Sequence, residues 1–165
     1  MKVRTAARVV LLNAEDEVFM LQCRDLGDHS RRYWFTVGGG AELGETSKQT
    51  AARELAEETG IECEPSDLLG PLATCRVSIQ FSTGVLVQDE VYFGMRFTED
   101  IDLDEAMWSD REKAAITGAR WWSKEEVEKS SEVIYPPELP FLIDLVCAGV
   151  EPVSPLPLNG PGGAE

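Results

Sequence analysis

The chain has 165 residues, of which 43% are hydrophobic, and this length favours a single domain with one buried core. Its formal net charge of −15 at pH 7 argues against a broad basic surface for nucleic-acid polymers or anionic membranes. A Cys/His zinc site has little support, because His29 is the single histidine and no CxxC pair occurs among the cysteines, which we expect to be reduced thiols: Cys23, Cys63, Cys75 and Cys147.

The first forty residues predict two β-strands, a polar loop and a short third apolar stretch. Residues 3–12 and 18–23 are rich in β-forming residues, and the turn residues between them predict a hairpin. Residues 24–33 are polar and predict a loop before the apolar residues 34–37. Arg31 and Arg32 end this loop and are candidates to bind a substrate phosphate, although solvated loop charges are the commoner outcome.

The N-terminal residues faintly resemble a signal peptide, with three positive charges and an apolar run. The run is too short, and acidic residues follow it without a clear cleavage pattern. No stretch approaches the ~20 apolar residues that cross a bilayer. We therefore expect a cytoplasmic protein.

Residues 39–61 predict a glycine-rich turn followed by a helix. Thr46 and Gln49 have the spacing of a capping box, and Gly60 suits the left-handed residue that ends a helix, so the helix should span residues 47–59. At roughly 100° per residue, three glutamates share one face and an apolar set shares the other. The acidic set is Glu54, Glu57 and Glu58, and the apolar set is Ala51, Ala52, Leu55 and Ala56.

The acidic face opposes local physics in two ways. Like charges four residues apart on a helix cost about 0.2 to 0.5 kcal/mol, and carboxylates are disfavoured near a helix C-terminus. A solvated face would be the ordinary reading of such a charge run. A hard divalent cation is the functional alternative, since carboxylate oxygens at this density suit Mg²⁺, which is completed by waters and substrate phosphates.

The spacing in this stretch favours the second reading. From Gly39 the chain reads glycine, five residues, Glu45, seven residues, and then the run Arg53, Glu54, Leu55, any residue, Glu57, Glu58, any residue, Gly60 and Ile61. This pattern resembles the signature of the Nudix hydrolase family at every defined position. One departure stands upstream, where Val37 occupies a place that is commonly proline.

The resemblance implies an α/β fold, a Nudix-type α/β/α sandwich with a central mixed β-sheet. It also implies a metal-dependent hydrolase that cleaves the pyrophosphate linkage of a nucleoside diphosphate joined to another moiety, with Mg²⁺ as cofactor and Mn²⁺ as a substitute. Glu54, Glu57 and Glu58 would hold the metal together with the carbonyl of Gly38, and Arg53 and Glu45 would orient them. A nucleotide-binding module without catalysis, an isomerase on the same fold and a homodimer stay open.

The second half of the chain predicts two long strands and a second acidic segment. Residues 72–81 and 85–97 alternate as strands around a turn, and residues 99–112 are strongly acidic. In many Nudix proteins a later acidic residue activates water; Glu112 is our choice for that base here, with Glu58 as the rival.

The last part of the chain predicts a strand, two helices and a tail. Residues 119–123 resemble a strand entering a helix capped by Ser123 and Glu126, and residues 139–148 predict an apolar helix. From residue 151 the chain is rich in proline and glycine without a period. We therefore expect one domain over residues 1–150 and a flexible tail over residues 151–165.

Overall fold

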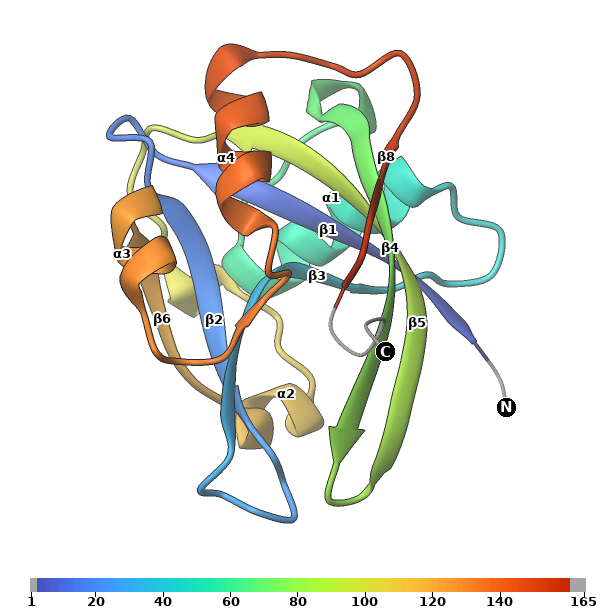
Figure 1. Ribbon diagram of the computed structural model, residues 1–165, viewed down its shortest axis with the longest axis vertical. Helices are drawn as coiled ribbons and strands as arrows, with labels where there is room; N and C mark the ends of the chain where they lie inside the picture. The colour runs from blue at the N-terminus through green and yellow to red at the C-terminus, as the bar shows by residue number, and fades with distance from the viewer. Residues whose placement is uncertain (1–2, 161–165) are drawn as a thin grey trace.

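The computed structural model describes residues 3–160 (Figure 1). Its strands are β1 (Arg4–Leu12), β2 (Val18–Arg24), β3 (Arg32–Gly40), β4 (Leu69–Phe81), β5 (Gly84–Arg96), β6 (Ile116–Trp122), β7 (Ile134–Tyr135) and β8 (Leu156–Leu158). Its helices are α1 (Ser47–Thr59), α2 (Asp110–Ala115), α3 (Lys124–Lys129) and α4 (Leu139–Ala148), with short 3₁₀ turns at Pro65–Asp67 and Leu103–Glu105.

The strands form one mixed sheet with helices on both faces. Within the described residues the order is β6-β2-β3-β1-β5-β4-β8, with β7 beside β3. The β1 strand runs parallel to β5 and antiparallel to β3. Figure 1 shows α1 behind this sheet and α4 in front of it. The α/β/α architecture with a central mixed sheet is therefore confirmed.

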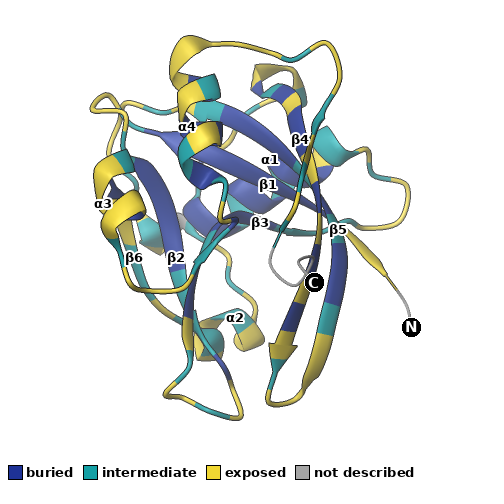
Figure 2. Cartoon of the chain, in the orientation of Figure 1, coloured by how far each residue is buried: buried dark blue, intermediate teal, exposed yellow. Residues whose placement is uncertain are grey.

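Two apolar clusters hold the three layers together. Val9, Leu11 and Leu55 belong to the cluster between the sheet and α1, whereas Val10 and Leu142 belong to the cluster between the sheet and α4. Because β1 is covered on both faces, its burial is continuous rather than alternating (Figure 2). The helix that carries the glutamates is thus fixed to the centre of the sheet.

The β3 strand is longer than the sequence predicts. Arg32 belongs to the strand rather than to a loop, and Gly38 to Gly40 pair with β1 instead of opening a turn. Glycine is required at position 38, because its φ is +149° and a Cβ there would lie 2.1 Å from the carbonyl oxygen of Ala7. The close approach of the Gly38 and Ala7 backbones therefore explains why the glycines pair with β1, which the glycine content alone does not indicate.

The C-terminal segment also differs from the expected loose tail. Leu156–Leu158 form β8, which pairs in parallel with β4, and the Gly70 amide donates to Glu151 Oε1 at 2.9 Å. The amide of Gly160 donates to Glu138 Oε1 at 3.3 Å. Parallel pairing supplies partners for the open edge of β4, which explains the order. Residues 161–165 of the expected tail lie outside the described part of the chain.

None of the helices within residues 3–160 is long and apolar enough to cross a membrane.

Candidate active site

The helix α1 forms where its local signals predict it. Thr46 is the N-cap, with Gln49 N donating to Thr46 Oγ1 at 3.2 Å and Thr46 N donating to Gln49 Oε1 at 2.9 Å. Gly60 ends the helix with φ 79°. Ala51, Ala52 and Leu55 pack on the sheet, whereas Ala56 is half-buried outside that cluster, so the predicted apolar face is confirmed for three of its four residues. Glu54 and Glu58 lie against Gly38 and Gly39 at the end of β3, whereas Glu57 contacts Arg53.

That glycine end lies against the carboxylates. A Cβ on Gly39 would lie 2.6 Å from Glu54 Oε1, and the Gly38 amide donates to Glu58 Oε1 at 3.2 Å. Glu54 and Glu58 are only 9% and 5% exposed. Two carboxylates of the acidic face are therefore buried between helix and strand, which a merely solvated face would not be.

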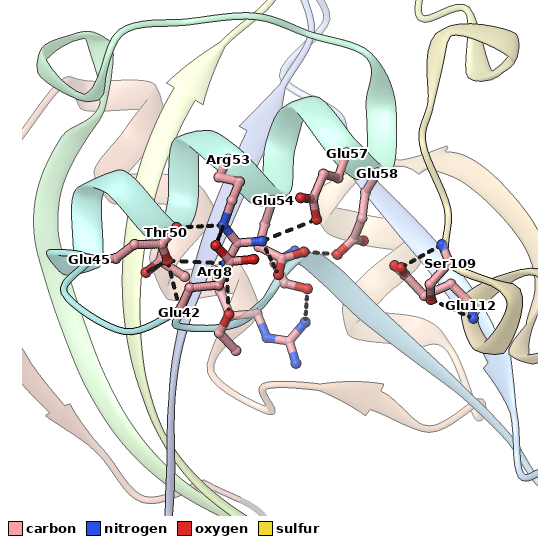
Figure 3. Close-up of polar contacts among 12 residues, drawn as sticks. Arg8, Glu42, Glu45, Thr50, Arg53, Glu54, Glu57, Glu58, Ser109 and Glu112 are labelled. Carbon is pink, nitrogen blue, oxygen red and sulfur yellow. Dashed lines mark hydrogen bonds and ion pairs between the residues drawn. The ribbon is translucent and has the colours of Figure 1, made fainter.

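Arg53 is the centre of a polar network on this face (Figure 3). Its Nε lies 2.6 Å from Glu45 Oε1, and its Nη1 lies 3.1 Å from both Glu54 Oε1 and Glu57 Oε2. Its Nη2 donates to the carbonyl of Gly40 at 2.9 Å. The hydrogen bonds from Arg53 lower the pKa of Glu45 to about 2, so Glu45 stays ionised and fixes the arginine.

Arg8 forms a second network that the sequence analysis missed. From the centre of β1 its Nε pairs with Glu90 Oε1 at 3.0 Å, and its Nη1 donates to the carbonyls of Thr36 and Gly38 at 3.2 and 3.1 Å. Glu90 also accepts from the Tyr92 hydroxyl. The one available signal was a charge inside an otherwise apolar strand.

The electrostatics of the buried glutamates favour a cation. Burial raises the pKa of Glu58 well above its usual range; Arg8 opposes this shift, and Glu54 and Glu112 add to it. Burial likewise raises the pKa of Glu54, with Arg53 opposing. Additional positive charge beside them would stabilise their ionised forms.

Glu112 lies beside this acidic face. It stands on α2, where its Oε1 accepts from Ser109 N at 3.0 Å in a capping box. Its charge raises the pKa of Glu54 and of Glu58, and Figure 3 shows its carboxyl turned toward Glu58. The fold thus brings Glu112 close to residues that precede it by more than fifty positions.

Arg31 and Arg32 are not brought to the carboxylates. Arg32 is the first residue of β3 and Arg31 directly precedes it, about 20 Å from Gly38 by the usual rise per residue. Arg31 donates to the carbonyl of Gln80 at 2.6 Å, pairs with Asp25 Oδ2 at 3.4 Å and lies over the ring of Tyr33. Arg32 is exposed. Arg31 therefore has internal partners that the sequence did not indicate.

Comparison with known families decides the relationship. The NUDIX domain family matches residues 2–142. The chain belongs to the Nudix family. The stretch of residues 39–61 is thus its Nudix box, and the confirmed helix α1 is the helix of that box. Nudix hydrolases generally use divalent metal ions and act on small nucleotide derivatives.

Individual relatives of this Nudix chain agree with the assignment. It is 29% identical to the dihydroneopterin triphosphate diphosphatase of Escherichia coli (strain K12) over 146 residues, which cover 76% of this chain and 91% of that protein. It is 42% identical over 60 residues, 36% of this chain, to the 8-oxo-dGDP phosphatase NUDT18 of Mus musculus. The match spans only 18% of the mouse protein, and likewise 18% of the putative nudix hydrolase 1 of Caenorhabditis elegans.

Solved structures share the Nudix fold. The MutT protein from Methanosarcina mazei Go1 superposes with a TM-score of 0.62 at 21% identity, covering 86% of this chain and 93% of that one. The Escherichia coli dihydroneopterin triphosphate pyrophosphohydrolase gives a TM-score of 0.61 at 23% identity, covering 89% and 99%. At these identities the likeness establishes the fold alone.

The Nudix box fits a divalent cation in the chemistry of its donors. Its face offers hard oxygen ligands, the carboxylates of Glu54, Glu57 and Glu58. The Gly38 amide donates to Glu58, and the Gly38 carbonyl accepts from Arg8 Nη1. Across residues 3–160, however, no three Asp, Glu, His or Cys side chains converge into a ready cluster. Arg53 Nη1 lies 3.1 Å from both Glu54 Oε1 and Glu57 Oε2, so it already pairs with these two carboxylates.

Proposed function

We propose that this Nudix protein is a metal-dependent hydrolase that cleaves the pyrophosphate linkage of a nucleoside diphosphate joined to another moiety. The observation that carries the proposal is the burial of Glu54 and Glu58 against the glycine end of β3, where both pKa values are raised. A stable protein has little reason to keep two like charges there unless they bind a cation.

Glu54, Glu57 and Glu58 would hold the ion with the Gly38 carbonyl, and Mg²⁺ is the metal we expect, with Mn²⁺ as a substitute. When bound, the ion would neutralise phosphate charge and lower the pKa of the attacking water. Arg53 would orient the carboxylates of the helix, because it binds Glu54, Glu57 and the Gly40 carbonyl of β3 at the same time.

Glu112 is the base that we propose to accept the proton of the attacking water. Its carboxyl lies beside Glu58, outside the network of Arg53. A positioned base contributes roughly 10² to 10⁴ in rate, so Glu112→Gln should lower kcat within that range. Glu58 is the rival: if a Glu112→Gln variant kept most of its kcat under saturating Mg²⁺, the role would return to the helix.

Substrates are chosen for the test from the relatives and from the chemistry of the box. The panel comprises dihydroneopterin triphosphate, 8-oxo-dGDP, ADP-ribose, nucleoside triphosphates, sugar nucleotides, dinucleoside polyphosphates and coenzyme A. Release of the products is measured with and without Mg²⁺ by chromatography, because hydrolysis of ADP-ribose or a sugar nucleotide gives two phosphorylated fragments rather than free phosphate. We expect metal-dependent release from at least one compound, and its loss in a Glu57→Gln, Glu58→Gln double variant.

Two other results would contradict the proposal. Tight nucleotide binding without release would indicate a binding module, and equal Mg²⁺ binding by the wild type and the double variant in calorimetry would remove the metal from the acidic face.

Arg31 and Arg32 stay predicted substrate contacts. Because Arg32 lies at the start of β3, away from the carboxylates, Arg32→Gln should raise KM and leave kcat unchanged.

A further inference from the structure

The acidic segment is attached to the last turn of α1 by two hydrogen bonds. The amide of Met107 donates to the carbonyl of Glu57 at 2.7 Å, and the indole Nε1 of Trp108 donates to the carbonyl of Glu58 at 3.0 Å. The last carbonyls of a helix have no partner within the helix, so they need donors from elsewhere. Two of those carbonyls belong to the glutamates of the Nudix box.

Trp108 is the side chain that makes this attachment. Met107 is 69% exposed and contributes its backbone, whereas Trp108 is half-buried and packs against the apolar cluster between α1 and the sheet. A tryptophan suits such a place, because it buries a large apolar surface and still presents one N–H donor. Trp108 is also the lone aromatic residue of the acidic stretch 99–112.

The attachment determines where Glu112 lies. Ser109 directly follows Trp108 and is the N-cap of α2, and its capping box with Glu112 fixes the first turn of that helix. Only three residues therefore lie between Trp108 and Glu112, and all of them belong to the cap or to the first turn of α2. Any shift of Trp108 relative to Glu58 would move Glu112 with it.

We infer that Trp108 is a positioning residue, which sets the distance between Glu112 and the Glu58 end of the Nudix box through its indole N–H. The inference rests on the proposed function, in which Glu112 accepts a proton and Glu58 binds the metal. Misplacement of reacting groups by about 1 Å can cost up to about 10²-fold in rate. Loss of one hydrogen bond loosens the segment rather than releasing it, so we expect kcat to fall about tenfold.

Variants at position 108 separate the donor from the packing. Trp108→Phe keeps an aromatic ring without the N–H, and replacement by β-(3-benzothienyl)alanine keeps the two-ring shape with sulfur in place of the N–H. Both should lower kcat about tenfold and leave KM within about twofold. Trp121→Phe is the matched control, because Trp121 packs in the same apolar cluster against Phe19 and should keep its kcat.

A double-mutant cycle tests the route of the effect. If Trp108 acts by placing Glu112, Trp108→Phe should have no further effect on kcat in a Glu112→Gln background. Full additivity of the two changes, or an unchanged kcat in the benzothienylalanine variant, would overturn the inference.

Amide hydrogen exchange provides a readout that does not depend on activity. In Trp108→Phe the amide of Met107 should exchange about fivefold faster, while the amides in the middle of α1 keep their protection. Unchanged exchange at Met107 would overturn the inference even if the wild type hydrolysed a substrate. Conversely, faster exchange in a chain that hydrolyses nothing would sink the proposed hydrolase while leaving the attachment by Trp108 established.

Discussion

Two arginine networks fix the glycine end of β3, and they differ in depth and in reach. Arg53 binds five groups within fourteen residues of itself in sequence, and its side chain is 22% exposed. Arg8 joins β1 to Glu90, 82 residues away, with side chains 11% and 4% exposed. Arg53 holds the Gly40 carbonyl and Arg8 holds the Gly38 carbonyl.

Because of this difference, the Arg53 and Arg8 networks should have different roles. A partly exposed network in which one cation pairs with several carboxylates contributes little stability but orders those carboxylates. A deeply buried pair is costly to break, because the remaining charge has no water to solvate it. Arg53 should therefore matter most for activity, and Arg8 for the integrity of the sheet on which the box rests.

The largest expected effect is on folding at Arg8. Arg8→Met leaves the Glu90 charge buried without its cation, so the free energy of unfolding should fall by about 3–5 kcal/mol. Urea denaturation monitored by circular dichroism measures it. An Arg8→Met, Glu90→Leu double variant should recover much of the loss. If Arg8→Met lowered the free energy of unfolding by less than about 1 kcal/mol, the Arg8–Glu90 pair would not be the network that supports the sheet.

Next in size is the effect of Arg53 on rate. Arg53→Met removes the cation that orders Glu54 and Glu57, so kcat should drop by about 10²-fold, with a stability loss of no more than about 1 kcal/mol. Steady-state kinetics and urea denaturation of the same sample report the two quantities. Arg76→Met is the control, since the Arg76–Asp89 pair is exposed and should change neither. If Arg53→Met lost as much stability as Arg8→Met, the two networks would not differ in their roles.

A smaller effect is expected on the pH dependence of the metal-free chain. In the folded chain Glu54 and Glu58 have pKa values above the ordinary 4.5, so the folded state binds their protons more tightly than the unfolded state. Stability from these groups is complete below pH 4.5 and is lost as pH rises through the folded pKa values. The lowered pKa of Glu45 acts oppositely, and only as pH falls toward 2.

Thermal melting in chelator between pH 5 and pH 8 measures this slope. Glu58→Gln should flatten it and, by removing the repulsion from Glu54 four residues away, stabilise the chain at pH 8 by about 0.5 kcal/mol. The exposed Glu125→Gln on α3 should leave the slope unchanged. If Glu58→Gln melted with the wild-type slope, burial of that carboxylate would not be the cause.

The smallest effect is expected from shortening the tail. The segment after Glu151 contacts β4 and Glu138, so a chain ending at Glu151 should turn over substrate with kcat within about twofold and lose about 0.5 to 1.5 kcal/mol from the lost hydrogen bonds. Kinetics and melting of the shortened chain provide the measurement. Loss of activity without unfolding would mean that the tail reaches the site.

The sequence by itself determined the parts whose causes are local. Both ends of α1 follow from its capping residues, Thr46 at the N-terminus and Gly60 at the C-terminus of the helix. The shared face of the three glutamates follows from helical periodicity. The link between Glu45 and Arg53 lies within the same motif, so the resemblance to Nudix proteins already contained it.

Only the tertiary structure decided what depends on strand register. The pairing of β1 with β3 and β5 places Arg8 between Gly38 and Glu90. The same pairing extends β3 through Gly38 to Gly40, for which the sequence predicts a turn. The attachment of Trp108 to α1 and the pairing of β8 with β4 likewise join segments distant in sequence. Such contacts form only after the chain has closed long loops, and a single sequence carries no local signal of which partner will be met.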